Sequence, residues 1–156
     1  MTTPASAETF FAAAFRHYQD AQLLRGQERL PNADHLAGIA AECGLKAVLT
    51  SYLGGYIDEG NRPNHRAHPR GSKKKDKHEY GHLPTLWDEI AVVSSGRSGS
   101  TFHQAMPQEN PFHQWDVAER YAEGSHIDVT RADQHLAAAR KVLPFYEEAK
   151  ITGVLP

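Results

Sequence analysis

The chain of 156 residues has little cysteine and no long apolar run near its start, and both absences limit what it can be. Cys43 is the only cysteine, so an intramolecular disulfide is excluded, and a lone thiol in an apolar helix indicates a reducing, cytoplasmic environment. The N-terminal region has no basic stretch, and its longest apolar run extends only from Phe10 to Phe15. This pattern predicts neither a signal peptide nor a membrane span.

Several catalytic motifs are also lacking. The chain has no glycine-rich phosphate loop, no nucleophile elbow and no pair of carboxylates with glycosidase-like spacing, which disfavours nucleotide hydrolases and glycosidases. Its length supports one hydrophobic core, and 40% apolar with 23% charged residues is ordinary for a soluble globular protein. We therefore expect one domain over residues 1–156, without a cofactor.

The charge is distributed unevenly. The net charge is -2, yet residues 61–78 contain seven Lys or Arg against one acid, so this basic segment carries +6 and the remainder -8. The basic residues are Arg62, Arg66, Arg70, Lys73, Lys74, Lys75 and Lys77. Flexible cations suit the phosphates of a polyanion, so we expect the segment to bind and steer RNA, the alternative being a solubilising loop. Prolines and glycines predict a mobile surface loop over residues 56–80.

Small and aliphatic residues dominate the segment 34–49, which predicts a helix that other helices enclose. Apolar spacing predicts further helices over about 6–26, 84–95, 100–106 and 115–123, and a last helix that contains Pro144. We expect Trp87 and Trp115 in the core and no β-strand. The predicted fold class is all-α, an antiparallel bundle of four to five helices with a long basic loop between the second and third.

Capping and breaking residues predict where these helices begin and end. Ser6 with Thr9 favours a start of the first helix, and Pro31 is expected to mark a turn before a second helix capped by Asn32 or Asp34. Thr130 with Asp133 forms a candidate capping box for the last helix. Pro144 is expected to kink or break that helix.

Three short elements resemble the HEPN superfamily. They are the stretch Glu42-Cys43-Gly44-Leu45-Lys46-Ala47-Val48-Leu49, the element Gly81-His82-Leu83, and Trp115 followed by Arg120-Tyr121. The resemblance extends over about residues 10–149 and implies a HEPN-like bundle that forms a homodimer, with helices packed across a two-fold axis. It also implies a metal-independent endoribonuclease or RNA-binding effector of toxin or defence type, with an antitoxin or a nucleotidyltransferase-like protein as partner.

RNA-cleaving members of that family resemble one another in an Arg followed by a His at a separation of four to six residues. Two pairs here have this spacing, Arg120 with His126 and, as a secondary candidate, Arg97 with His103. On a continuous helix, two side chains six positions apart point in directions that differ by about 240°. The chain must therefore bend between the two partners if both are to contact one substrate. Gly124-Ser125 supplies a bend in the first pair and Gly99-Ser100 in the second.

The chemistry explains why these residue types are needed. Metal-free cleavage uses the RNA 2′-OH as nucleophile, which requires a group that titrates near neutral pH, such as His126. It also requires a permanent cation for the phosphate, such as Arg120. In the alternative interpretation, Arg120 forms an ordinary ion pair and His126 is an exposed loop residue, since ten histidines make chance pairs common. A homodimer would bring two Arg–His pairs into one cleft.

Two further patterns have competing interpretations. His65, His68, His78 and His82 form a candidate zinc set, but neighbouring positive charge opposes a dication, so a solvated loop and no metal is expected. Glu42 and Lys46 are expected to form a one-turn ion pair. The alternative function for the whole chain is a non-catalytic helical adaptor that binds a protein or nucleotide partner.

Overall fold

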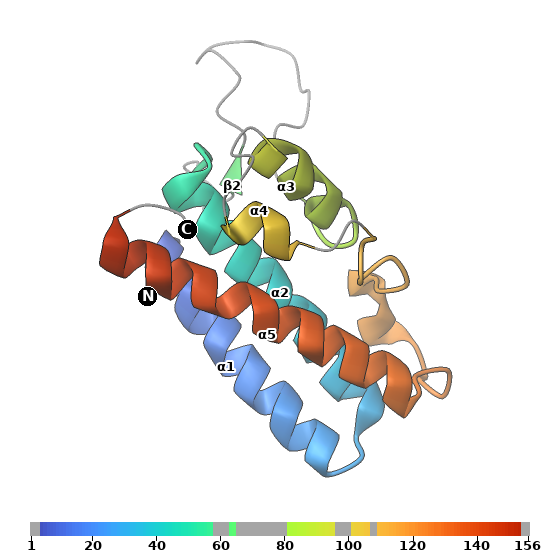
Figure 1. Ribbon diagram of the computed structural model, residues 1–156. Helices are drawn as coiled ribbons and strands as arrows, with labels where there is room; N and C mark the ends of the chain where they lie inside the picture. Colours follow the sequence, from blue (N-terminus) through green and yellow to red (C-terminus); the bar gives the residue numbers. More distant parts are fainter. Residues whose placement is uncertain (1–3, 58–62, 65–80, 96–100, 107–108, 154–156) are drawn as a thin grey trace.

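A computed structural model of the protein describes residues 4–57, 63–64, 81–95, 101–106 and 109–153. This part of the chain is all-α, with five α-helices and one short 3-10 helix (Figure 1). The helices are α1 (Ala7–Gly26), α2 (Leu30–Tyr52), α3 (Thr85–Ser95), α4 (Thr101–Ala105), η1 (Val117–Tyr121) and α5 (Val129–Thr152). The seven cations of the basic segment lie outside the described residues, as do its histidines His65, His68 and His78.

Helix α2 is the centre of the fold, as its small residues predict. Helices α1 and α5 pack along it, and thirteen of its residues are buried. A Cβ atom at Gly38 would overlap the indole of Trp115, and one at Gly44 would lie 3.0 Å from Val142. The small side chains therefore let α5 and the chain before it approach the α2 backbone closely.

The three long helices do not all alternate in direction. Arg25 contacts Asp133 and Glu8 contacts Lys150, so α1 runs antiparallel to α5. Asp34 contacts His135 while Gly44 faces Val142, so α2 and α5 run in the same direction (Figure 1). The chain returns through α3, α4 and η1 between these two helices, so a shared direction of α2 and α5 is compatible with an antiparallel order of successive helices.

The shorter helices cover the C-terminal half of α2. Their apolar side chains form one core with the second half of α2, and both tryptophans are buried in it, as expected. Its large members include Leu45, Leu49, Leu86, Trp87, Ile90, Phe102, Phe112, Trp115 and, from α5, Tyr146. At about 25 cal/mol per Å² of buried apolar surface, such side chains are the main source of stability.

The N-terminal capping box of α1 is confirmed. The Thr9 N–H donates to Oγ of Ser6 at 3.1 Å, and the Ser6 N–H donates to Oγ1 of Thr9. The predicted start of α2 is wrong, because that helix already begins at Leu30 with Pro31 in its first turn. Proline is tolerated there because the first N–H groups of a helix have no intrahelical acceptor.

The predicted start of the last helix is also wrong by two residues. Asp128, not Thr130, caps α5, and its carboxylate accepts the N–H of Arg131 at 2.8 Å. Pro144 does not break the helix, which continues through it to Thr152. Pro144 lies on the exposed face of α5, where its ring does not contact the core.

The prediction of no β-strand is wrong, and so is the prediction of a loop at the start of residues 56–80. The short strands β1 (Tyr56–Ile57) and β2 (Pro63–Asn64) pair antiparallel, with Tyr56 opposite Asn64 and Ile57 opposite Pro63. Neither strand is long enough to show an alternating pattern in sequence. The remainder of 56–80 lies outside the described residues.

Candidate functional site

Arg120 and His126 lie in a polar turn, residues 116–128, that connects the core to α5. Asp116 caps η1 by accepting the N–H of Ala118 at 2.7 Å. Gly124 has a φ of +92°, and a Cβ there would lie 2.7 Å from Pro31, so only glycine fits without strain. The expected bend between Arg120 and His126 is therefore present at Gly124.

Both predicted catalytic side chains are exposed, and each has its own partner. The Arg120 guanidinium lies 4.8 Å from the centroid of the Tyr121 ring, a cation–π contact on the surface. Nε2 of His126 lies 3.5 Å from Oε1 of Glu119. The turn thus places one permanent cation and one carboxylate-oriented imidazole on the same exposed segment.

Glu119 is itself held by a chain of charges that leads into the core. Nη2 of Arg131 donates to both carboxylate oxygens of Glu119 at 2.7 Å, and Nε of Arg131 lies 3.4 Å from Oδ2 of Asp34. Oδ1 of Asp34 lies 2.5 Å from Nδ1 of His135, and both residues are buried. Four charged or titratable groups from α2, η1 and α5 therefore fix the base of the polar turn.

Sequence inspection missed Asp34, Arg131 and His135 as parts of this network. Asp34 was treated as a helix cap, whereas it lies within α2 and is fully buried. The available signal was a carboxylate in the apolar segment 34–49, because a buried charge requires a partner. The sequence did not indicate which partner, since His135 is 101 residues away.

His35, next to Asp34, packs against Trp115, the residue that precedes the polar turn. Its ring stacks on Trp115, with centroids 5.4 Å apart and an angle of 16° between the planes. Partial burial lowers the pKa of His35 from its ordinary value, and the positive charge of Arg120 lowers it further. This imidazole is therefore biased toward the neutral form near Arg120.

A second buried carboxylate, Glu42, connects α2 to the start of α3. Its Oε1 accepts from Nζ of Lys46 at 2.8 Å and lies 2.9 Å from Nδ1 of His82, and its Oε2 accepts the N–H of Leu83 at 3.4 Å. The one-turn ion pair is confirmed, but it is buried, with side-chain exposures of 7% and 11%. His82, a candidate zinc ligand, is instead the third member of this cluster.

Of the secondary pair, Arg97 and His103, only His103 belongs to the described residues. Arg97 lies outside the described residues, while Nδ1 of His103 lies 3.2 Å from Oγ of Ser94 at the contact between α3 and α4. Within the described ranges, no group of three or more His, Cys, Asp or Glu is arranged to hold a metal ion.

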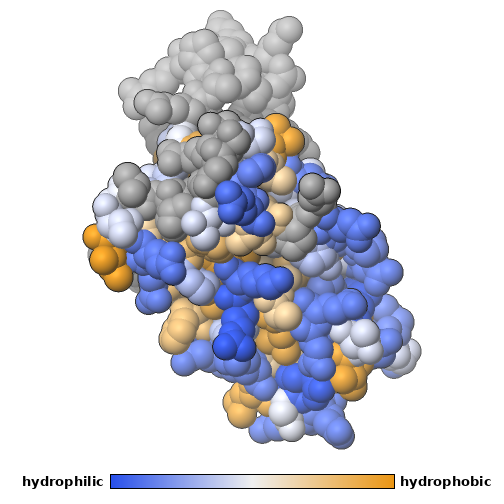
Figure 2. All heavy atoms as spheres, viewed as in Figure 1, coloured by the Kyte–Doolittle hydropathy of each residue, from blue (hydrophilic) through white to orange (hydrophobic). Residues whose placement is uncertain are grey.

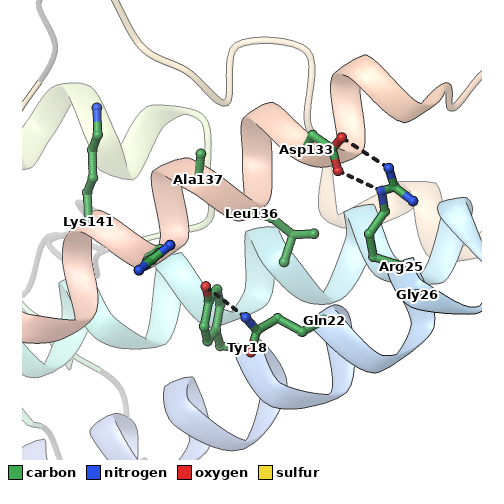
Figure 3. Close-up of a pocket in the computed structure, with 9 residues that line it drawn as sticks. Tyr18, Gln22, Arg25, Gly26, Asp133, Leu136, Ala137 and Lys141 are labelled. Carbon is green, nitrogen blue, oxygen red and sulfur yellow. Dashed lines mark hydrogen bonds and ion pairs between the residues drawn. The ribbon is translucent and has the colours of Figure 1, made fainter.

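A separate open pocket of about 790 Å³ lies between α1 and α5. Its lining includes the cations Arg25, Arg140 and Lys141 and one acid, Asp133. Arg25 is paired with Asp133 at 2.6 and 3.1 Å at one end, and the Gln22 amide donates to the Tyr18 hydroxyl nearby (Figure 3). Figure 2 shows apolar patches among polar ones on this face.

Comparison of the chain with protein-family models, curated proteins and solved structures found no significant match. Among the helices that the structure describes, none combines the length and apolar character needed to cross a bilayer.

Proposed function

We propose that the protein is a HEPN-like helical effector that binds RNA and cleaves it without a metal ion, with the polar turn as its site. The observation that carries this proposal is the pair of exposed side chains, Arg120 and His126, on a turn anchored through Glu119 and Arg131 to buried Asp34. An anchored turn supplies the fixed geometry that catalysis requires, with reactive groups still open to a large substrate.

The roles follow from the chemistry of the groups. His126 transfers a proton as general acid or base, with Glu119 orienting its ring through the 3.5 Å contact. Arg120 stabilises the negative charge that develops on the phosphate. Cations of residues 61–78 steer the strand toward the site, and a homodimer brings two such turns into one cleft.

The experiment is cleavage of tRNA and mRNA by purified protein in the presence of EDTA. We expect His126→Ala and Arg120→Ala each to lower the rate at least about 100-fold. His113→Ala is the matched control, because His113 is an exposed imidazole ahead of the polar turn and should leave the rate unchanged. Undiminished cleavage by both variants would remove these roles, and absence of cleavage by the wild type would remove the activity.

The pocket between α1 and α5 favours a second candidate, a non-catalytic adaptor. Two of its cations, Arg140 and Lys141, are exposed, and the apolar side chains of Leu136 and Ala137 line the same pocket. Such a mixed surface is typical of a protein interface. This alternative predicts no nuclease activity and a stable complex with the product of a neighbouring gene, tested by co-expression and size-exclusion chromatography.

A further inference from the structure

Cleavage through the 2′-OH requires two proton transfers. The bond from phosphorus to the 2′-oxygen forms while the bond to the 5′-oxygen breaks, giving a 2′,3′-cyclic phosphate and a 5′-hydroxyl. One proton leaves the 2′-OH and one is delivered to the departing 5′-oxygen, so an efficient site uses a base and an acid. Within one chain the Arg–His motif supplies one imidazole, His126, so the second role there falls to another group.

His35 is the imidazole that the fold adds to this site. It lies in the first third of α2, and its imidazole stacks on Trp115, the residue directly before the polar turn. This stack fixes the plane of the imidazole ring. Trp115 is 1% exposed and fills the space above Gly38, so it cannot move easily. Nδ1 of His35 is buried and has no hydrogen-bond partner in the described part of the chain, while the side chain as a whole is only partly buried.

The charged and titratable groups around this ring come from three helices. Glu119 and Arg120 of η1, Asp34 and Glu42 of α2, and His17 of α1 are near enough to interact with it electrostatically, and both η1 and α1 pack against α2. Burial and the Arg120 cation hold the pKa of His35 below its ordinary value. A neutral imidazole at pH 7 can accept a proton, which is the requirement for a general base.

We propose that His35 is a catalytic residue that accepts the proton of the 2′-OH, while His126 donates a proton to the departing 5′-oxygen. This assignment rests on the proposed RNA cleavage. It gives each of the three cationic or titratable groups a separate role, with Arg120 on the phosphate.

The test compares an ordinary oligoribonucleotide with one whose departing 5′-oxygen is replaced by sulfur, which leaves without needing a proton. We expect His35→Gln to slow cleavage of both substrates at least about 100-fold. His126→Ala should be slow on the ordinary substrate and close to wild type on the sulfur substrate. His113→Gln serves as the matched histidine control.

Two further readouts separate a chemical role from a packing role. The wild-type kcat/KM should rise with pH through the His35 pKa, below about 6.5, and His35→Gln should lose this limb. His35→Phe retains a ring against Trp115, so activity in this variant would show that only packing matters and would overturn the inference.

The outcomes are distinguishable. Wild-type cleavage with an equally active His35→Gln overturns the role of His35 and leaves the proposed function intact. A wild type that cleaves neither substrate overturns the proposed function, and with it this assignment.

Discussion

Asp34 and Glu42 are two buried carboxylates on the same helix, and they are neutralised in different ways. Glu42 receives a cation from its own helix, Lys46, and adds His82 from the start of α3. In the part of the chain that the structure describes, the side-chain partners of Asp34 are His135 and Arg131, both of α5 and distant in sequence. The first cluster is mainly local, whereas the second exists only when α5 has docked.

This difference between the two carboxylates shows which of them depends on tertiary contacts. A carboxylate paired with Lys four residues later keeps that partner in an isolated helix. A carboxylate paired across two helices is left without its partners if they separate, and an unpaired buried charge is costly. We therefore expect the Asp34 cluster to be the more sensitive of the two.

The largest effect is expected for Asp34→Ala. Removal of this carboxylate leaves buried His135 without its partner and breaks the contact to Arg131, which keeps Glu119, and we expect a loss of about 3–5 kcal/mol in the free energy of unfolding. Urea denaturation at pH 7 measures it. Asp133→Ala is the control, because its pair with Arg25 is on the surface and should matter little. Equal losses in the two variants would contradict a special role for Asp34.

A smaller loss is expected for Glu42→Gln, about 2–3 kcal/mol, because Lys46 then loses its charged partner but can still donate to the amide oxygen. The double variant Glu42→Gln with Lys46→Met removes the cation as well and should regain most of the loss. Urea denaturation of the three proteins provides the comparison. A double variant as unstable as the single one would show that the carboxylate itself, through His82 and Leu83, holds α3.

Gly38 lies one helical turn from each of the two carboxylates. The variant Gly38→Ala tests the close contact between the α2 backbone and Trp115. The added methyl group would overlap Trp115, so we expect a net loss of about 1–3 kcal/mol despite the better helix propensity of alanine. Gly26→Ala is the control, since no atom lies within 4 Å of its Cβ position. Thermal unfolding measures both, and a stabilised Gly38→Ala would contradict the packing described.

The smallest effect concerns Cys43, beside Glu42. Burial, and secondarily the charge of Glu42, raises the pKa of its thiol to about 11. Since the thiolate is the reactive form, labelling by a thiol reagent should be slow at pH 8 and should still rise at pH 10. Glu42→Gln should accelerate it a few-fold. A wild-type labelling rate that levels off near pH 9 would contradict the raised pKa.

The sequence predicted the arrangement best where one residue type determines it. Small residues in α2 predicted its central place, and glycine at position 124 predicted the bend between Arg120 and His126. The start of α2 was misplaced because Pro31 suits a helical first turn as well as a loop. The local sequence is compatible with a loop and with a helical first turn at Pro31, and the packing of α2 determines which of the two forms.

The connected groups of the site were less predictable. Glu42 and Lys46 are four residues apart, so their contact is visible in the sequence, but the link to His82 is not. The contacts of Asp34 and His35 depend on how α5 and Trp115 pack against α2, which no local spacing encodes. Pairings across about a hundred residues follow from the whole core.

Pro144 has a consequence for the pocket between α1 and α5. Proline has no N–H, so the carbonyl of Arg140, four residues earlier, lacks the donor that a regular α-helix would supply. The interior of a helix ordinarily offers only side chains to a ligand. In α5 the main chain therefore has an acceptor that the regular helix pattern does not use, and it belongs to Arg140, a residue that lines the pocket.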